Sequence, residues 1–396
     1  MFLLSHIADD KRFMEQALRL AALGRGRTHP NPMVGCVIVK NGQVVGTGYH
    51  RRAGEPHAET HALLEAGEAA EGATVYVTLE PCAHHGRTPP CAEALVRAKV
   101  GRVVAAMVDP DERVAGKGLE LLRAAGIQAE SGLLEAEATA LNRAYLKLKA
   151  TGRPLVILKW AMTLDGKIAC ASGDSRWVTG ETARAHLHQV RDQVDAILVG
   201  ANTARLDDPE LTARPEGPGP LPGWAGGLDP GPDPEWRPKD PLRIVLDSLA
   251  KTSLEARLFA PDLLERPRPN KTLIAAIRLA STIRLSAMRD LGAETLVLPE
   301  YDDMVDVGAL LDELGRRGIA SLLVEGGGHV HWSFLSRGFV DYVMVYLAPK
   351  VVGGQNAPGP VLSDGLQLMR DAWFTGNLHA TQLGEDVLLE GDFKAR

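Results

Sequence analysis

Hydrophobic residues in the first half of the chain alternate between helical and strand periodicities. Apolar positions recur on one helical face from about Asp10 to Leu23, and Gly24 ends the pattern. Two β-rich runs, residues 33–40 and 43–49, follow and are joined by Asn41-Gly42, the dipeptide most typical of a tight hairpin turn. The pattern then predicts strands over residues 74–79 and 103–108, helices after His57 and near Cys91, and helices over 118–125 and 135–149.

The second half of the chain repeats a strand–helix–strand pattern. Strands are predicted over residues 155–161 and 196–200, with a helix over 181–194 between them. This order indicates an α/β fold with a mainly parallel sheet covered by helices. Further apolar runs predict strands over residues 243–246, 272–276, 295–298, 321–324 and 342–347, and a helix over 307–317. We find no internal repeat in the sequence.

Two features of the sequence bear on domain organisation. Gly152 and Pro154 end the long helix of the first half, so we predict two domains, residues 1–150 and 151–396. Between Pro215 and Pro241, nine prolines and six glycines leave few backbone donors and little apolar area for a regular element. We therefore expect residues 215–241 to form a surface insertion in the second domain.

Charge and hydropathy exclude several classes of protein. The chain has 44 Lys and Arg against 50 Asp and Glu, a net charge of −6, and no long basic block. Bulk charge therefore does not favour a nucleic acid or an anionic membrane as the partner. No apolar run approaches the roughly 18 residues that span a bilayer, and the N-terminus does not resemble a secretory signal. We expect a soluble, cytoplasmic protein.

Three residues in the first half of the chain form a candidate set of zinc ligands. His57, Cys82 and Cys91 offer one imidazole and two thiolates, and three protein ligands leave a fourth position open for water, as in catalytic sites. Zinc lowers the pKa of bound water to about 7, which makes hydroxide available as a nucleophile. Glu59 lies two residues after His57, close enough to serve as the proton shuttle of a zinc deaminase.

Other interpretations of these residues are simpler. A His-Ala-Glu tripeptide is common by chance, and the two cysteines could be buried apolar residues. The order of the residues, with a strand between them, favours the catalytic zinc site. We expect His61 to lie on the surface or behind the ligands. Cys36 and Cys170 sit in apolar runs, so we expect both in the core.

The spacing of the cysteines indicates a family. Eight residues separate Cys82 from Cys91, unlike the Pro-Cys-x-x-Cys of cytidine and tRNA adenosine deaminases. The stretch Glu80–Cys91 instead resembles the RibD family of riboflavin biosynthesis, in which a pyrimidine deaminase is fused to a reductase. The likeness continues through residues 31–35, 57–59, 114–118, 159–169, 175–179, 201–212 and 324–328.

The resemblance implies a fold and two reactions. It implies an N-terminal cytidine-deaminase-like zinc domain followed by a C-terminal dihydrofolate-reductase-like α/β domain that uses NADPH. The implied substrate is a small phosphorylated molecule, 2,5-diamino-6-(5-phosphoribosylamino)pyrimidin-4(3H)-one, which is hydrolytically deaminated. Reduction of the ribosyl side chain would then give 5-amino-6-(5-phosphoribitylamino)uracil. We also expect a homo-oligomer, a dimer or a tetramer.

The resemblance also implies site residues in both domains. In the deaminase cleft, Asn31, His50 and His84 are candidate substrate contacts, beside Lys117. In the reductase domain, substrate positions match Ser175, Arg191, Leu211, Arg214 and Glu325, and cofactor positions match Met162, Trp177, Thr203, Asp207, Ser248 and Gly327. Arg191 and Arg214 offer planar forks that suit a sugar phosphate. Residues 326–328, between a strand and a helix, would let backbone N–H groups approach the cofactor phosphate.

One segment departs from the family pattern. Where the family commonly shows Asp-Pro-Asn-Pro, this chain has Asp109-Pro-Asp-Glu112. The added negative charge is expected to weaken binding of a phosphorylated substrate unless Arg113 and Lys117 offset it.

Two alternatives to the family function differ in kind. A deaminase acting on tRNA would need a basic face, which the net charge of −6 does not favour. A non-enzymatic nucleotide sensor with a structural zinc would have no use for the proton shuttle Glu59.

Overall fold

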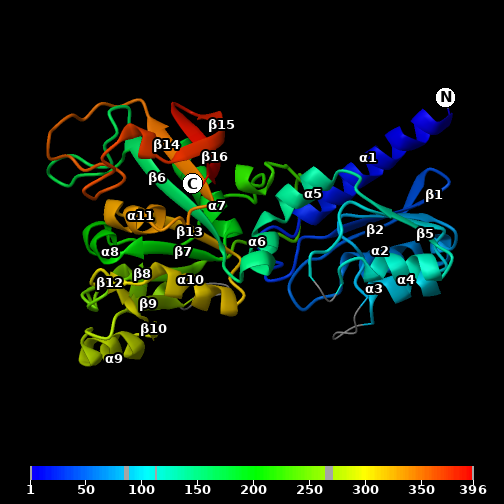
Figure 1. The fold of residues 1–396 in the computed structure, drawn as a ribbon, viewed down its shortest axis with the longest axis horizontal. Helices are drawn as coiled ribbons and strands as arrows, with labels where there is room; N and C mark the ends of the chain where they lie inside the picture. Colours follow the sequence, from blue (N-terminus) through cyan, green and yellow to red (C-terminus); the bar gives the residue numbers. More distant parts are fainter. Residues whose placement is uncertain (1, 84–88, 112–113, 264–270, 395–396) are drawn as a thin grey trace. The chain divides into compact units, whose positions relative to one another are not determined.

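The computed structural model describes residues 2–83, 89–111, 114–263 and 271–394 (Figure 1). The chain divides into two compact units. The first unit contains residues 1–151 together with 220–234, and the second contains residues 152–219 and 235–396. None of the described helices is long and apolar enough to cross a membrane.

The first unit is built on a mixed five-stranded sheet in the order β2-β1-β3-β4-β5. Asn41 and Gly42 join the first two strands with φ angles of 52° and 77°, which confirms the predicted tight turn. β1 pairs antiparallel with β2 and β3, whereas β3, β4 and β5 are parallel. The strands are β1 (Gly35–Lys40), β2 (Gln43–Tyr49), β3 (Thr74–Val77), β4 (Arg102–Ala105) and β5 (Gln128–Ser131).

Helices cover both faces of this sheet (Figure 1). On one face, α1 (Phe2–Ala22) packs against β1 and β3, with the ring of Phe13 5.4 Å from that of Tyr76. On the other face, the core includes Cys36, which is fully buried as expected. The helices of that face are α2 (Ala58–Ala66), α3 (Cys91–Arg97) and α4 (Lys117–Ala124). The candidate zinc ligands lie at the ends of elements, and the sheet and these helices fix their positions.

The long helix predicted over residues 135–149 is two helices. α5 (Glu135–Leu141) and α6 (Arg143–Thr151) are separated at Asn142. The Asn142 side chain accepts a hydrogen bond from the Met33 backbone N–H at 2.8 Å and donates to the Met33 carbonyl at 3.0 Å. The prediction was wrong because Met33 and Asn142 are 109 residues apart in sequence, and helical periodicity cannot detect a contact between them.

The segment predicted as an exposed insertion, residues 215–241, is only partly exposed. Leu221, Trp224 and Ala225 are buried, and a short 3₁₀ turn, η2 (Gly223–Ala225), packs against α5 and α6. Gly226 lies so close that an added Cβ would stand 3.3 Å from Ala140 Cβ. The expectation of exposure was wrong here because the few apolar residues between the prolines find an apolar partner surface.

The second unit contains a nine-stranded sheet in the order β10-β9-β8-β7-β13-β6-β14-β16-β15. The strands from β10 to β14 pair in parallel, and β16 and β15 add an antiparallel edge, which confirms a mainly parallel sheet. Its strands are β6 (Leu155–Thr163), β7 (Ala196–Gly200), β8 (Leu242–Leu246), β9 (Thr272–Ala276), β10 (Glu294–Val297), β13 (Ser321–Gly326), β14 (Tyr342–Ala348), β15 (Phe374–Leu383) and β16 (Asp386–Lys394). A separate short hairpin joins β11 (Glu300–Tyr301) and β12 (Met304–Val305).

Two buried clusters lie on opposite faces of this sheet. One includes Ile197 and Val199 with residues of α8 (Ala201–Asp207) and α9 (Thr282–Asp290), and the other includes Leu198 with α10 (Val307–Arg316) and α11 (Gly328–Leu335). A further helix, α7 (Glu181–Gln193), connects β6 to β7 as predicted. The sequence did not predict α8, α9, β15 or β16. β15 is mostly exposed and has no alternating apolar face to detect.

Candidate functional site

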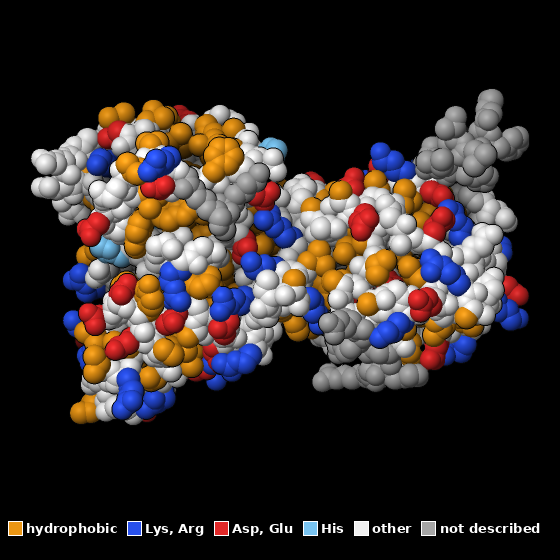
Figure 2. All heavy atoms as spheres, in the orientation of Figure 1, with side chains coloured by type: hydrophobic (Ala, Val, Ile, Leu, Met, Phe, Trp, Pro, Cys, Tyr) orange, Lys and Arg blue, Asp and Glu red, His pale blue; other side chains and the backbone are white. Residues whose placement is uncertain are grey.

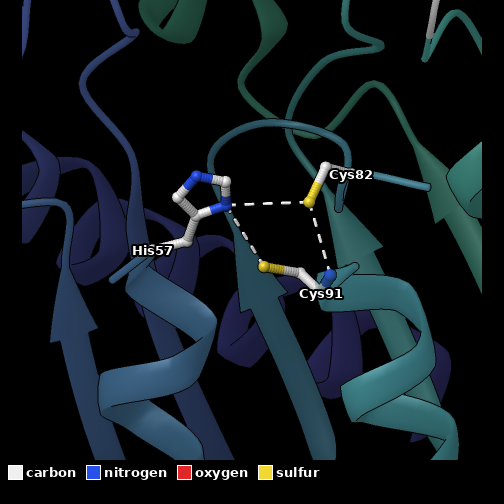
Figure 3. Close-up of side chains that lie close together, drawn as sticks. All are labelled: His57, Cys82 and Cys91. Carbon is white, nitrogen blue, oxygen red and sulfur yellow. Dashed lines mark hydrogen bonds between the residues drawn. The ribbon is translucent and has the colours of Figure 1, made fainter. Parts of the chain in front are cut away.

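The three candidate zinc ligands of the first unit converge (Figure 3). His57 Nδ1 lies 3.6 Å from Cys82 Sγ and 3.3 Å from Cys91 Sγ, and all three ligand atoms lie within 4.8 Å of one another. One ring nitrogen and two sulfurs are the donors that Zn²⁺ prefers, and their separations suit corners of one tetrahedron. The residues present therefore fit a zinc ion with one coordination position left open.

Element ends position these ligands. His57 immediately precedes α2, and Cys91 is the first residue of α3. The Cys91 backbone N–H donates a hydrogen bond to Cys82 Sγ at 3.3 Å. The hydrogen bond that Cys82 Sγ accepts from the Cys91 thiol, with one from His57, lowers the pKa of Cys82, and the same bond raises the pKa of Cys91. Metal ions bind thiolate, so this arrangement favours the ligand form of Cys82.

Glu59 lies beside the ligands in the first turn of α2. Its side chain is buried, and burial raises the pKa of its carboxyl above the usual range. Glu59 lines the same cavity as His57 and Cys82, a space of about 300 Å³. A carboxyl group with a raised pKa next to a metal-held water is suited to accept a proton and return it.

Two predicted substrate contacts line this cavity. Asn31 Nδ2 lies 3.2 Å from His50 Nε2, and His50 Nδ1 lies 3.1 Å from the Pro56 carbonyl. Because the carbonyl can only accept, Nδ1 carries the ring proton, and Nε2 accepts from the Asn31 amide. Burial lowers the pKa of His50, which favours this neutral form. His84, the third predicted contact, lies outside the described residues.

Glu80 borders the same cavity and was not among the predicted site residues. The buried Glu80 carboxylate accepts hydrogen bonds from four backbone N–H groups in the loop after β4 and at the start of α4. These donors are Asp109 at 3.3 Å, Gly116 at 2.8 Å, Gly118 at 2.8 Å and Leu119 at 3.2 Å. Glu80 thus joins the chain next to the ligand Cys82 to the loop that forms the opposite wall.

Two further residues of this wall come from α6 and were also not predicted. Tyr145 OH donates to Asp109 Oδ1 at 2.9 Å, and Lys149 Nζ pairs with Asp111 Oδ2 at 2.9 Å. Tyr145 and Lys149 both line the cavity. Their only signal in the sequence is the spacing of four residues, which places two side chains on one face of a helix.

The second unit contains a larger cavity of about 850 Å³. It lies where β7 and β13 end and α8 and α11 begin, at the carboxyl edge of a parallel sheet, where ligands of α/β proteins commonly bind. The structure brings five predicted residues into its lining: Ser175, Thr203, Asp207, Ser248 and Gly327.

The triglycine segment at this edge has the predicted geometry. Gly326 ends β13 and Gly328 begins α11, while Gly327 has a φ of 83°. An added Cβ on Gly326 would lie 2.6 Å from Val199 Cα, and one on Gly328 would lie 2.4 Å from Leu362 Cγ. Larger residues are excluded, so the backbone stays open toward the cavity.

Several other predicted residues do not line this cavity. Trp177 is 62% exposed, with the Arg184 guanidinium 4.6 Å from its ring centre. Leu211 is buried in the apolar cluster under α8 and α9. Met162 lies on β6 and pairs with Leu347 of β14.

Cys170, expected in the core, is partly exposed because it sits in a turn closed by its N–H bond to the Asp174 carbonyl.

The arginine predicted to bind a sugar phosphate is already occupied. Arg191 Nε and Nη2 donate to the two carboxylate oxygens of Glu325 at 2.7 and 2.8 Å. The third guanidinium nitrogen donates to the Thr212 carbonyl at 3.3 Å, and Lys159 Nζ lies 3.6 Å from Glu325. Pairing with Arg191 compensates the buried Glu325 carboxylate for the water that it lacks, and a contact between Arg191 and a sugar phosphate stays a prediction.

Arg214 is likewise engaged. Its Nη1 donates to the Glu210 carboxylate and to the Thr212 hydroxyl, and its backbone N–H donates to His188 Nδ1 at 3.3 Å. Thr212 connects Arg214, whose side chain is about half exposed, to the buried pair of Arg191 and Glu325.

Charged side chains are mixed on the visible surface. Over the face drawn in Figure 2, the described Lys and Arg side chains are interspersed with Asp and Glu. The described part of this face therefore has no broad basic surface of the kind that binds tRNA.

Two family models match the chain. The family model of the cytidine and deoxycytidylate deaminase zinc-binding region matches residues 7–107, and that of the RibD C-terminal domain matches residues 154–389. The riboflavin biosynthesis protein RibD of Escherichia coli (strain K12) is 43% identical over 383 residues, 96% of this chain and 98% of its own length. RibD of Actinobacillus pleuropneumoniae is 42% identical over 382 residues, 96% of this chain and 94% of its own length.

Solved structures show the same likeness over the whole chain. RibD of Acinetobacter baumannii superposes with a TM-score of 0.82 at 37% identity and covers 98% of this chain and 100% of its own. A diaminohydroxyphosphoribosylaminopyrimidine deaminase/5-amino-6-(5-phosphoribosylamino)uracil reductase of Thermotoga maritima gives a TM-score of 0.79 at 31% identity, with the same coverage. The chain thus belongs to the RibD family of bifunctional riboflavin biosynthesis enzymes, with a zinc-binding deaminase domain and an NADPH-using reductase domain.

Proposed function

We propose that the first unit deaminates 2,5-diamino-6-(5-phosphoribosylamino)pyrimidin-4(3H)-one and that the second reduces the ribosyl side chain of the product to ribityl. The observation that carries this proposal is the buried Glu59 carboxyl in one cavity with His57, Cys82, Asn31 and His50. The name of the Thermotoga maritima relative gives the same two reactions.

In the deaminase site, His57, Cys82 and Cys91 would hold the zinc ion, which supplies an activated water when it is bound. Glu59 takes a proton from that water as its oxygen adds to the carbon that bears the 2-amino group. The same carboxyl gives this proton to the adjacent ring nitrogen, then takes the proton of the added hydroxyl and delivers it to the leaving nitrogen, so that ammonia departs and a carbonyl remains. Asn31 and His50 provide polar contacts that orient the pyrimidine.

In the reductase site, NADPH supplies the hydride that reduces the sugar carbon attached to the amine. Thr203, Ser248 and Gly327 line the cavity where the cofactor would bind, and Ser175 and Asp207 line the same space. Arg191 and Glu325 form an ion pair near this cavity, and their charges cancel. The role of the pair is to shape the part of the site that binds the substrate and to keep it polar.

The test is to mix zinc-replete protein with the diamino substrate and to follow ammonia release and NADPH oxidation in the same sample. We expect ammonia first, followed by stoichiometric NADPH loss. Ammonia alone would contradict the reductase assignment, and absence of both signals would contradict the substrate. Deamination of tRNA instead would support the alternative with a macromolecular substrate.

A variant separates the two sites. We expect Glu59→Gln to abolish ammonia release and to leave NADPH oxidation on pre-deaminated substrate intact. Glu65→Gln, an exposed substitution on the same helix, is the matched control. Loss of both activities in Glu59→Gln would contradict two independent sites. The homo-oligomer and the cytoplasmic location remain predictions, and light scattering of the purified protein measures the first.

A further inference from the structure

One wall of the larger cavity, in the second unit, is built from two stretches of chain without helix or strand, residues 164–180 and 349–368. The first stretch follows β6 and contributes Ile168 and Ser175 to the lining. The second follows β14 and contributes Pro358 and Leu362. Because no helix or sheet fixes these lining residues, their positions depend on individual contacts with neighbouring parts of the chain.

Backbone contacts attach the segment of residues 357–362 to both of its neighbours. Ile168 N–H donates to the Pro358 carbonyl at 3.0 Å, and Leu362 N–H donates to the Gly328 carbonyl at 3.1 Å. The Leu362 side chain also packs directly on Gly328, since a Cβ added there would lie 2.4 Å from Leu362 Cγ. The segment thus bridges the loop after β6 and the triglycine turn at which α11 begins.

Two side chains from different elements hold the same segment. Lys167 Nζ, in the loop after β6, donates to the Ala357 carbonyl at 2.9 Å. His331 Nδ1, in α11, lies 2.7 Å from the Pro360 carbonyl, and the imidazole is the donor because a carbonyl only accepts. The two carbonyls flank Pro358, the residue of the segment that borders the cavity together with Leu362.

Neither Lys167 nor His331 lines the cavity. His331 is 2% exposed, one helical turn after Gly327, and Lys167 is half-buried directly after the turn at Gly166, whose φ is 75°. Both side chains therefore act on the cavity through the segment that they hold, and not by direct contact with a ligand.

We propose that Lys167 and His331 are positioning residues of the reductase, which keep the segment of residues 357–362 in the conformation that binds NADPH. The inference rests on the proposed function, because that function places the cofactor in this cavity. Neither residue takes part in hydride transfer. Their contribution is to form the wall of the cavity before the cofactor arrives.

Loss of either side-chain contact should weaken binding and spare the reaction. The apparent Kd equals the intrinsic Kd divided by the fraction of molecules whose segment is in place. The backbone contacts of Ile168 and Leu362 remain in such a variant, so this fraction falls without reaching zero. Once NADPH is bound the segment is in place, and hydride transfer then proceeds at the normal rate.

The test measures NADPH binding to the full-length, zinc-replete protein by the fluorescence of the nucleotide, with no substrate present. We expect the Kd to rise about threefold in Lys167→Met and in His331→Leu, and about tenfold in the double variant, since separate contacts add in free energy. At saturating NADPH, kcat on pre-deaminated substrate should stay within about twofold of the wild type. Lys167→Arg keeps a donor and should bind NADPH as the wild type does.

Hydrogen exchange locates the change within the second unit. Exchange in peptides that contain Ile168 or Leu362 should become faster in the double variant, and saturating NADPH should reverse this. Peptides from β7 should exchange as they do in the wild type. Faster exchange in β7 as well, with an unchanged Kd, would show a merely structural role and overturn the inference.

Exposed residues of the same types serve as controls. Lys271→Met and His379→Leu lie in the second unit and outside the cavity lining, and should leave the Kd unchanged. His331→Phe replaces His331→Leu if urea unfolding shows that the latter is not folded. A wild-type Kd in the double variant, or an equal rise in the controls, would contradict the inference. Absence of NADPH binding to the wild type would instead contradict the proposed function.

Discussion

The carboxylate of Glu80 accepts a hydrogen bond of 2.8 Å from the backbone N–H of Gly118, 38 residues further along the chain. An added Cβ on Gly118 would stand 1.9 Å from the Pro81 carbonyl oxygen, so only glycine allows this approach. The contact fixes the start of α4 against the segment that carries the ligand Cys82. All four of these partners are N–H donors, so both oxygens of the Glu80 side chain act as acceptors.

We predict that Glu80→Gln destabilises the first unit. The amide nitrogen would face backbone N–H groups and leave buried donors without an acceptor, at a cost of about 3 kcal/mol. Chemical denaturation measures this change, and zinc content measures its effect on the ligands. Glu120→Gln, an exposed position on α4, should change neither quantity. Wild-type stability in Glu80→Gln would show that water replaces the lost contacts.

Removal of zinc should affect one activity alone. After dialysis against a chelator we expect ammonia release to fall by about a hundredfold or more, because no activated water is left, and Zn²⁺ should restore it. NADPH oxidation on pre-deaminated substrate should persist, since its cavity lies wholly within the second unit. Cys82→Ser should reproduce the loss, whereas Cys170→Ser should retain about one zinc per chain. Deamination that survives chelation would contradict the zinc assignment.

The ion pair of Arg191 and Glu325 should contribute strongly to stability of the second unit. Burial alone would raise the pKa of Glu325, but the charges of Arg191 and Lys159 outweigh it and lower that pKa to about 2. Arg191→Met would leave the buried carboxylate short of its main partner and cost about 4 kcal/mol. Urea unfolding of the full chain checks this, with the exposed Arg289→Met as control. Adding Glu325→Gln to Arg191→Met should recover part of the loss.

Stability of the second unit should fall as the solution becomes mildly acidic. Burial, followed by the charges of Arg191 and Arg214, lowers the pKa of His188 from 6.5 to about 4. Between these two pH values the unfolded chain binds the proton and the folded chain does not, so the free energy of unfolding decreases as pH falls. Denaturant unfolding at about pH 7 and about pH 5 should show a smaller decrease in His188→Gln than in the wild type. The exposed His379→Gln should behave as the wild type does.

The elements that rest on local patterns were predictable. The Asn41-Gly42 turn, the strands β8 and β9 and the helix α10 all lie within one or two residues of their predicted bounds. Their signals are periodicity and turn chemistry within a few residues. The helix break at Asn142 and the burial of Trp224 were missed, since each depends on a partner far away in the sequence.

The sequence by itself determined which chemistry to expect at the first site. The identity of His57, Glu59, Cys82 and Cys91 predicts zinc binding and proton transfer, because ligand preference is a property of the side chain and not of its neighbours. Only the tertiary structure decided what surrounds that chemistry. Residues distant along the chain form the N–H bonds to Glu80, the ion pair of Lys149 with Asp111 and the ion pair of Arg191 with Glu325. Charge balance in a cavity depends on which groups the fold brings within a few ångströms, and composition does not contain that information.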